Sequence, residues 1–243
     1  MKLYRLLILL LFVSCVDNDA PGLVVDEELI LSNFLENKTY IKDNVIACAA
    51  SNDKIPDLIN VYFYPEEGAG NFKLYVSGAE NGNDFSKYGL VESGSQSFLD
   101  GTMRQFVTRS ELKWFVVVYK IENTIHISTP IRSKVFSQPT LYDANVTINQ
   151  ETSGMPKFSW DIESEENNAI FFEVVTTSNS EFLSGTYTHE NNFQYYKLNN
   201  VVLNVTKGTP PDLILGDTYN FIVMDVSLDN WVNKVIMTSF TAE

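Results

Sequence analysis

The stretch of chain from residue 215 to residue 240 restricts the possible folds more than any other part of the sequence. Tyr219, Phe221 and Val223 occupy every second position in it, so on an extended chain their side chains point to one face. A short turn-forming break follows, and a second β-prone segment then begins at Trp231. The pattern predicts a β-hairpin at the end of an antiparallel domain.

Strand-like segments separated by turn residues fill the chain from about residue 38 onward. No stretch there keeps a helical period, and the 16 Phe and 12 Tyr residues are types that strands favour. We therefore predict an all-β protein. Ahead of the strands, the apolar residues at 29–35 are expected to pack onto the first domain as a short helix or strand.

Two parts of the sequence follow the same plan. In each, an aromatic strand leads through an acidic loop to a second aromatic strand, and an apolar strand, a short turn and a final strand come later. The plan aligns residues 61–76 with 158–175, and 114–119 with 219–224. We expect two domains with separate cores, divided near Pro139, because proline is excluded from central strands.

The motif Leu-Gly-x-x-Tyr-x-Phe-x-Val at 215–223 resembles the penultimate strand of a fibronectin type III domain, and Trp160 resembles the tryptophan of its B strand. The resemblance covers the second half and implies a tyrosine corner, with Tyr219 buried and its hydroxyl bonded to backbone at 213–216. In the first half, Trp114 stands where the corner tyrosine would be, and the B strand has no tryptophan. For that half the sequence supports only an immunoglobulin-like sandwich.

The start of the chain carries a strong local signal. A basic n-region precedes a short apolar run at 6–13, which is too short to span a bilayer as a helix, and Cys15 follows closely. Phe-Val-Ser-Cys at 12–15 resembles a bacterial lipobox, in which the cysteine is diacylated and becomes the mature N-terminus, although Phe12 stands where leucine is usual. The resemblance implies a membrane anchor through lipid on Cys15. In the alternative, the segment is an ordinary secretory signal and Cys15 has no special role.

An acidic stretch without any Lys or Arg follows at 16–36 and predicts an extended tether. Its first residues, Val-Asp-Asn-Asp at 16–19, resemble the export tag of Bacteroidota lipoproteins, which implies the outer face of the outer membrane. The fold class we predict is all-β, with two tandem antiparallel β-sandwich domains, immunoglobulin-like and then fibronectin type III-like, after a lipoprotein signal peptide. The predicted divisions are a signal peptide at 1–14, a lipidated acidic tether at 15–36, and sandwiches at 37–137 and 138–243.

The acidic charge limits the possible partners. The formal net charge of −14 argues against nucleic acid and against adhesion to anionic lipid, and we interpret it as a source of solubility. Once Cys15 is lipidated, Cys48 is the remaining thiol and has no partner for a disulfide. We interpret Cys48 as a small apolar strand residue rather than a catalytic thiol, because both histidines lie far from it in the sequence.

An aromatic run in the second half is the candidate ligand-binding surface. It comprises Tyr187, His189, Phe193, Tyr195 and Tyr196, and such rings can stack on sugars. Tyr187, Tyr195 and Tyr196 are the residues we expect to carry such a site. The alternative is a core-plus-edge role, because half of the residues on an alternating strand face the core.

Two strands are apolar on both faces. Ile222, Met224 and Val226 fall opposite the Tyr219 face. In the first half, the same reasoning predicts that the outer face carries Phe115, Val117 and Tyr119. The pattern indicates that an outer face is covered by the other domain or by a partner.

Neither acidic loop has the register of a calcium site, so we predict no metal and no cofactor. The carboxylates concerned are Glu66, Glu67, Asp161, Glu163, Glu165 and Glu166. The sequence also has no G-x-S-x-G, no H-E-x-x-H and no glycine-rich phosphate loop, so we predict no catalytic residues.

The function we expect is that of a non-enzymatic binding or scaffolding lipoprotein of the cell envelope. Its partner would be a glycan or another envelope protein, and the lipid would hold it on the outer membrane, at the cell surface. Two alternatives remain open: a hydrolase that uses loop carboxylates, and a purely structural envelope component.

Overall fold

The computed structural model describes residues 27–109, 111, 113–162 and 167–243. The predicted lipidation site Cys15 and the acidic tag at 16–19 lie outside the described residues, as do Glu163, Glu165 and Glu166. Within the described ranges, no helix is both long enough and apolar enough to cross a membrane.

The first half of the described chain forms two antiparallel sheets with one added parallel strand. One sheet has the order β1-β9-β8-β4-β5, with β10 also paired to β8, and the other has the order β2-β3-β7-β6. The elements are η1 (Glu27–Leu29), α1 (Leu31–Leu35), β1 (Tyr40–Val45), β2 (Ala47–Ser51), β3 (Leu58–Phe63), β4 (Gly70–Ser77), η2 (Phe85–Lys87), β5 (Gly89–Leu90), β6 (Gln96–Phe98), β7 (Met103–Arg109), β8 (Trp114–Ile121), β9 (Thr124–Ser128) and β10 (Ile131–Arg132).

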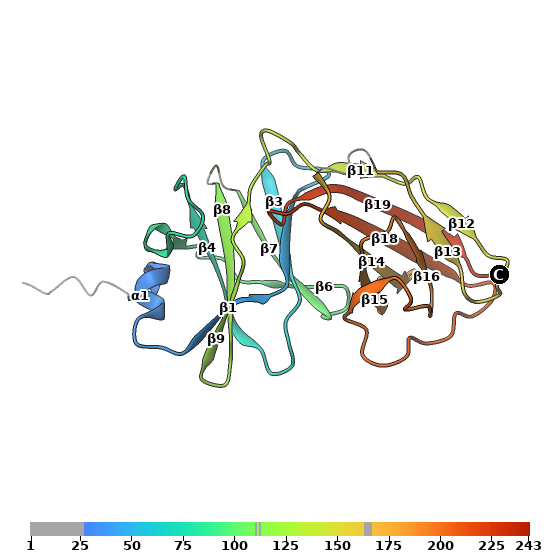
Figure 1. The fold of residues 1–243 in the computed structure, drawn as a ribbon, viewed down its shortest axis with the longest axis horizontal. Coiled ribbons are helices and arrows are strands. Elements are labelled where there is room, and N and C mark those ends of the chain that lie inside the picture. The colour runs from blue at the N-terminus through green and yellow to red at the C-terminus, as the bar shows by residue number, and fades with distance from the viewer. Residues whose placement is uncertain (1–26, 110, 112, 163–166) are drawn as a thin grey trace, which may run out of the picture.

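The second half also forms two sheets. One has the order β11-β19-β18-β14-β15-β17 and the other the order β12-β13-β16. The elements are β11 (Leu141–Asp143), β12 (Thr147–Asn149), β13 (Lys157–Ser159), β14 (Ile170–Thr177), β15 (Phe182–Thr188), β16 (Asn192–Gln194), β17 (Val201–Asn204), β18 (Thr218–Val226) and β19 (Val232–Thr241). Strands dominate both halves (Figure 1), so the predicted all-β class is confirmed.

The repeated plan seen in the sequence is confirmed by the strand order. The order β2-β3-β7 in the first half corresponds to β12-β13-β16 in the second, and β9-β8-β4-β5 corresponds to β19-β18-β14-β15. The opening strand of each half pairs in parallel with the second strand of that half's long hairpin, β1 with β9 and β11 with β19. Each half is thus a sandwich of the immunoglobulin-like and fibronectin type III-like kind. The division at 137/138 stays a prediction.

The tyrosine corner is present as predicted. The Tyr219 side chain is buried, and its hydroxyl oxygen accepts a 2.8 Å hydrogen bond from the backbone N–H of Ile214. Trp160 is also buried in this core, with its ring edge-on to Phe171 at 5.2 Å between centroids. Burial of these rings removes much apolar area from water, which stabilises the second sandwich.

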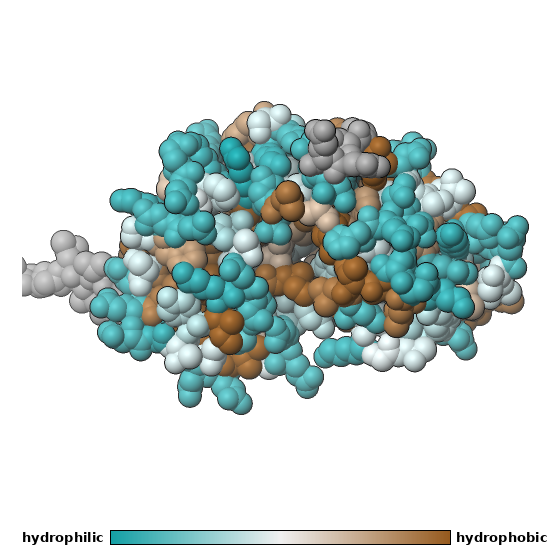
Figure 2. All heavy atoms as spheres, in the orientation of Figure 1, coloured by the Kyte–Doolittle hydropathy of each residue, from teal (hydrophilic) through white to brown (hydrophobic). Residues whose placement is uncertain are grey.

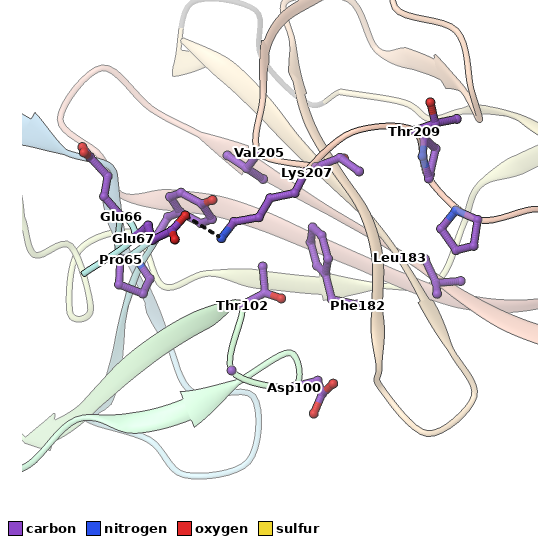
Figure 3. Close-up of a pocket in the computed structure, with 15 residues that line it drawn as sticks. Pro65, Glu66, Glu67, Asp100, Thr102, Phe182, Leu183, Val205, Lys207 and Thr209 are labelled. Carbon is purple, nitrogen blue, oxygen red and sulfur yellow. Dashed lines mark ion pairs between the residues drawn. The ribbon is translucent and has the colours of Figure 1, made fainter. Parts of the chain in front are cut away.

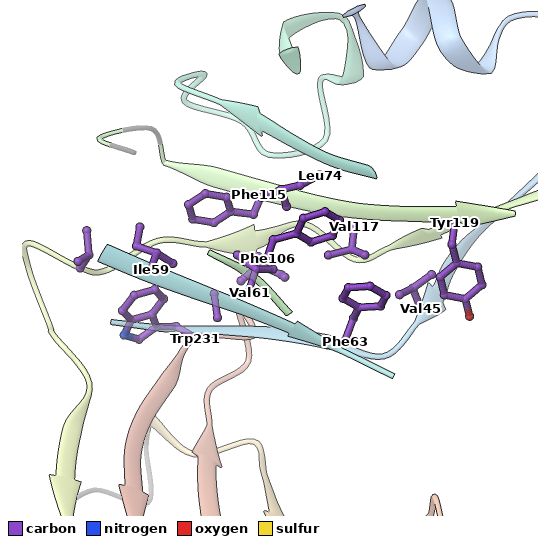
Figure 4. Close-up of a cluster of buried hydrophobic side chains, with 13 residues drawn as sticks. Val45, Ile59, Val61, Phe63, Leu74, Phe106, Phe115, Val117, Tyr119 and Trp231 are labelled. Carbon is purple, nitrogen blue, oxygen red and sulfur yellow. The ribbon is translucent and has the colours of Figure 1, made fainter. Parts of the chain in front are cut away.

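The apolar segment ahead of the strands packs as a short helix, as we expected. Leu31, Phe34 and Leu35 of α1 are buried, and their spacing places them on one face of the helix. They join a cluster with Val116 and Val118 of β8 and so cover the outer face of that sheet. The inner face of β8 carries Phe115, Val117 and Tyr119 (Figure 4), so the predicted inner and outer faces are exchanged in the first half.

In the second half the outer-face prediction is correct, and the cover is the first half. Ile222, Met224 and Val226 belong to a buried cluster that also contains Ala50 and Tyr62 of the first half. Strands of the first half run roughly upright in Figure 1 and those of the second half roughly horizontal, so the two sheets cross where they meet. The cluster joins the two sandwiches through a continuous apolar layer.

A tryptophan from the second half completes the core of the first. Trp231 lies in the turn between β18 and β19, is fully buried, and packs among residues that include Ile59 and Phe106 (Figure 4). Its indole N–H donates to the carbonyl oxygen of Gln138 at 2.9 Å. Each half keeps its own core cluster, as expected, but the two cores are not independent, because Trp231 belongs by sequence to the second half and by packing to the first.

Replacement of Trp231 by alanine tests this shared core. The change leaves a cavity in the first sandwich although the residue is in the second, so we expect a loss of about 3–5 kcal/mol in the free energy of unfolding. Calorimetry should show one transition that moves as a whole to lower temperature. Leu228→Ala, in the same turn but 84% exposed, should leave the stability within about 0.5 kcal/mol. Two transitions, with only one lowered, would contradict a shared core.

Candidate functional site: the interdomain groove

A depression of about 570 Å³ lies where the two halves meet (Figure 3). We call it the acidic end of the interdomain groove, because carboxylates stand on its first-half wall. Residues of the first half that line it are Tyr64, Pro65, Glu66, Glu67, Asp100, Gly101 and Thr102. Residues of the second half that line it are Phe182, Leu183, Val205, Thr206, Lys207, Thr209, Pro210 and Pro211.

A second depression of about 460 Å³ continues the first and is the apolar end of the groove. Both ends share Glu66. The other lining residues include close neighbours in the chain. The acidic end has Tyr64, Thr102 and Val205, and the apolar end has Tyr62, Met103 and Leu203. The two depressions share one lining residue and draw on the same three segments, so they are adjacent, and we call the pair the interdomain groove. Figure 2 shows apolar atoms gathered along the seam between the halves.

The apolar end is lined mostly by aliphatic and aromatic side chains. The larger ones include Ile46, Phe172 and Tyr187, and Leu203 stands 42% exposed at its side. A concave, largely apolar site of this size is typical of ligand pockets in proteins. Burial raises the pKa of the Cys48 thiol to about 12 and keeps it protonated, so Cys48 contributes apolar surface rather than a reactive thiolate.

Strained backbone shapes the floor of the acidic end. The turn between β6 and β7 has Leu99 at φ 48°, Asp100 at φ 53° and Gly101 at φ 83°. A positive φ is unfavourable for leucine, but the Leu99 side chain is 6% exposed and packs into the cluster between the halves. Burial of Leu99 offsets the strain, and the same turn presents Asp100 and Thr102 to the groove.

A bulge shapes the far side of the apolar end. The parallel pairing of β1 with β9 shifts register between Ile41 and Val45, and Asp43 within the shift has φ 56°. Bulges turn side chains out of the regular alternation of a strand. Here the bulge brings Asp43 and Asn44 to the groove.

The charged groups of the groove are nearly all acidic. Its lining contains Asp43, Glu66, Glu67 and Asp100, and the opposing charge comes from Lys207. The Lys207 ammonium lies 3.8 Å from a Glu67 carboxylate oxygen, and both side chains are highly exposed. Such a pair contributes little to stability, so the groove keeps a negative potential available to a ligand.

Of the three predicted stacking tyrosines, Tyr195 and Tyr196 are in edge-on contact, with ring centroids 4.7 Å apart, and Tyr187 lies apart from them. Tyr187 is buried and stacks on Phe172 with centroids 4.5 Å apart, although its edge reaches the apolar end of the groove. Tyr195 is fully buried, and its hydroxyl donates to the Pro211 carbonyl at 2.8 Å. Tyr196 is partly exposed and bonds to Asp212. Burial of Tyr187 and Tyr195 argues against a common platform for a sugar ring.

Other candidate residues of the sequence lie apart. His189 is exposed with its Nδ1 3.1 Å from the Ala169 carbonyl oxygen, and Phe193 is a core residue. Asp161 is exposed, away from both ends of the groove. Across the residues the structure describes, no group of three or more His, Cys, Asp or Glu side chains could hold a metal ion.

Sequence reasoning missed most of the groove, although Glu66, Glu67 and Tyr187 were noted for other reasons. Its lining comes from segments as distant as residues 43 and 211, and no local pattern joins them. The useful signal was the apolar outer face of β18, which showed that something covers it. When one domain covers a face of the other, an interface forms between them, and ligand pockets occur preferentially at domain interfaces.

A buried carboxyl lies in the second sandwich, close to the groove wall. Glu173 of β14 is 1% exposed, and burial raises its pKa to about 8. The Thr188 hydroxyl lies 2.7 Å from a Glu173 oxygen and 2.6 Å from the Glu190 carbonyl oxygen. One hydroxyl hydrogen cannot serve both oxygens, so a proton on Glu173, donated to Thr188, completes the chain. Burial and this chain of hydrogen bonds both favour the neutral form of Glu173.

The stability of the protein should therefore fall as Glu173 ionises. Folding favours the neutral form of Glu173. Its contribution to the free energy of unfolding is therefore complete below the pKa of the unfolded state and is lost as the pH rises through the raised pKa of the folded state. A shift from 4.5 to about 8 corresponds to a loss on the order of 5 kcal/mol across that range. Denaturant unfolding at several pH values should show the decline, and Glu173→Gln should remove it.

Glu181→Gln is the matched control, because Glu181 is exposed on the hairpin that joins β14 to β15. This variant should keep the pH dependence of the wild type. A Glu173→Gln protein whose stability declines as steeply as the wild type would show that Glu173 is already ionised in the folded state.

No protein-family model matches the chain, and no curated protein matches it. Among solved structures, a two-domain fibronectin type III segment of chicken tenascin is 12% identical, with a TM-score of 0.30, and covers 82% of this chain and 98% of that one. The chicken CNTN1 FN1–FN3 domains are 12% identical, with a TM-score of 0.28, and cover 82% of this chain and 65% of that one. The fold assignment rests on the strand order and the tyrosine corner described above.

Proposed function

We propose that the protein is a non-catalytic, lipid-anchored binding module of the cell envelope, and that its ligand lies in the interdomain groove. The observation that carries this proposal is the origin of the groove walls. Both halves supply them, and a shared core fixes one half against the other. A site that is already formed loses little conformational entropy when it binds a ligand.

Polar contacts beside the core add to this rigidity. The backbone N–H of Ser51 donates to the Thr140 hydroxyl at 2.9 Å, and the N–H of Thr140 donates to the Ser51 hydroxyl at 2.7 Å. Asp229 in the Trp231 turn pairs with Lys134 at 2.9 Å. Most two-domain chains move about their linker, whereas these contacts oppose such a motion.

The exposure of the groove carboxylates also favours binding. Glu66 and Glu67 stand in solvent at the edge of the groove. Carboxylates used for proton transfer are usually set apart by burial in contrasting environments. Exposed acids suit the recognition of a polar or charged ligand, and a glycan or a segment of another envelope protein would meet this description.

The position of α1 supports the proposed anchoring. The helix follows the tether in the sequence and lies at the end of the molecule away from the second half (Figure 1). A lipid on Cys15 would then hold the first half toward the membrane and leave the groove clear of it. The acidic tag at 16–19 supports placement on the outer face of the outer membrane.

A groove-filling substitution tests the binding site. Thr102, on the floor of the acidic end, is replaced by tryptophan, which occupies the space a ligand needs. Binding detected on arrays of polysaccharides and purified envelope proteins should weaken by about tenfold or more, equivalent to about 1.4 kcal/mol. Thr152→Trp, at an exposed site outside the groove, should bind as the wild type does. Equal binding by both variants would place the ligand elsewhere.

The anchor is tested by Cys15→Ser. The variant should take up no labelled palmitate and should be missing from the outer-membrane fraction, because the lipid-bearing sulfur is gone. Surface proteolysis of intact cells should degrade the wild-type protein only if it faces outward. Unchanged palmitate labelling in the variant would exclude lipidation at Cys15.

A further inference from the structure

The charges of the groove point to a basic ligand. Asp43, Glu66, Glu67 and Asp100 are all exposed carboxylates of its lining, and Lys207 is the basic residue among them. Among the described residues, one of these four acids forms an ion pair: Glu67, whose contact with Lys207 is long at 3.8 Å. Lys or Arg side chains of a ligand would therefore find carboxylates at both ends of the groove.

The same groove also requires apolar side chains. The partly exposed Ile46 and Ile170 and the exposed Leu203 make the apolar end a surface that water covers poorly. A small cation would leave this surface uncovered. A ligand that reaches both depressions must carry its charges and its apolar groups over an extended length, as a polypeptide does.

Strand β17 beside the groove offers main-chain hydrogen bonds. It is the last strand of its sheet, so among the described residues one of its edges has no neighbouring strand. Val202 and Leu203 on it are 52% and 42% exposed, and an exposed apolar edge is a template for a further strand. Val205 N–H donates inward to Gly185 at 3.0 Å, so by the alternation of a strand the N–H of Asn204 faces outward.

We propose that the ligand of the interdomain groove is an extended polypeptide segment that alternates apolar residues with Lys or Arg and pairs with the free edge of β17. The inference rests on the proposed binding function and names the ligand class. Main-chain pairing supplies affinity, and the two ends of the groove select the side chains. The protein's own tether at 16–26 does not fit, because it is acidic.

Two synthetic peptides of twelve residues test this inference. In one, Lys alternates with Val or Ile, and in the other Glu replaces each Lys; both carry a fluorescent label. Fluorescence anisotropy with the full-length protein in detergent should show that the basic peptide binds at least about tenfold more tightly than the acidic one, a difference of about 1.4 kcal/mol. Raising the salt from about 50 mM to about 500 mM should weaken binding several-fold, because exposed charges are screened.

Matched variants locate the binding. A triple variant, Glu66→Gln, Glu67→Gln and Asp100→Asn, should weaken the basic peptide about tenfold. The control neutralises three exposed acids outside the groove, by Glu151→Gln, Asp217→Asn and Glu243→Gln, and should bind nearly as the wild type does. Equal loss in both variants would mean attraction to overall charge and would overturn the inference.

A second pair of variants tests the edge of β17. Asn204→Ala and Asn204→Pro remove the same side chain, but the proline also removes the outward N–H. With folding checked by circular dichroism, binding should persist in the alanine variant and be lost in the proline variant. Equal affinity in the two would overturn the pairing with β17.

The outcomes separate this inference from the function on which it rests. If the basic peptide fails to bind but Thr102→Trp abolishes binding to a polysaccharide, the groove is a binding site and the polypeptide inference is wrong. If no array partner and neither peptide binds in the groove, both proposals fail.

Discussion

Burial of Trp231 in the core of the first sandwich is the contact on which the arrangement of the molecule depends. The residue lies in a turn of the second sandwich, fully shielded from solvent, with its indole N–H bonded to Gln138. A large aromatic ring held in this way contributes several kcal/mol that neither half could obtain alone. Ile222, Met224 and Val226 extend the same apolar contact across the sheet of β18. The two sandwiches therefore fold onto one another rather than hang from a linker.

The groove is a consequence of that contact. Two curved sheets that cross leave a seam along which side chains cannot fill all the space. At Leu99 and Asp43 the backbone adopts positive φ angles, which places acidic side chains along the seam. Leu99 itself is buried between the halves, so the energy gained by its burial holds the strained turn in place. Stability and the shape of the candidate site thus have the same origin.

Polar groups follow a different rule in the interior and in the groove. Glu173 is enclosed by the second sandwich, where Thr186 and Thr188 bond to it and burial favours the neutral acid. The groove acids Glu66 and Glu67 face water and carry their charges toward a ligand. Burial therefore gives the glutamate at position 173 a structural role, and exposure to solvent makes those at positions 66 and 67 suited to recognition.

The sequence by itself determined the local features. The alternation of Tyr219, Phe221 and Val223 is the local pattern of a strand, and the corner joins Tyr219 to Ile214, only five positions away in the sequence. Both features could therefore be predicted. Tertiary structure decided which faces are covered and by what, and it buried Tyr187 and Tyr195. The bonds that set the two halves, such as Ser51 to Thr140, join residues 89 apart. No local pattern encodes such pairs, because their energy exists only once both sandwiches have formed.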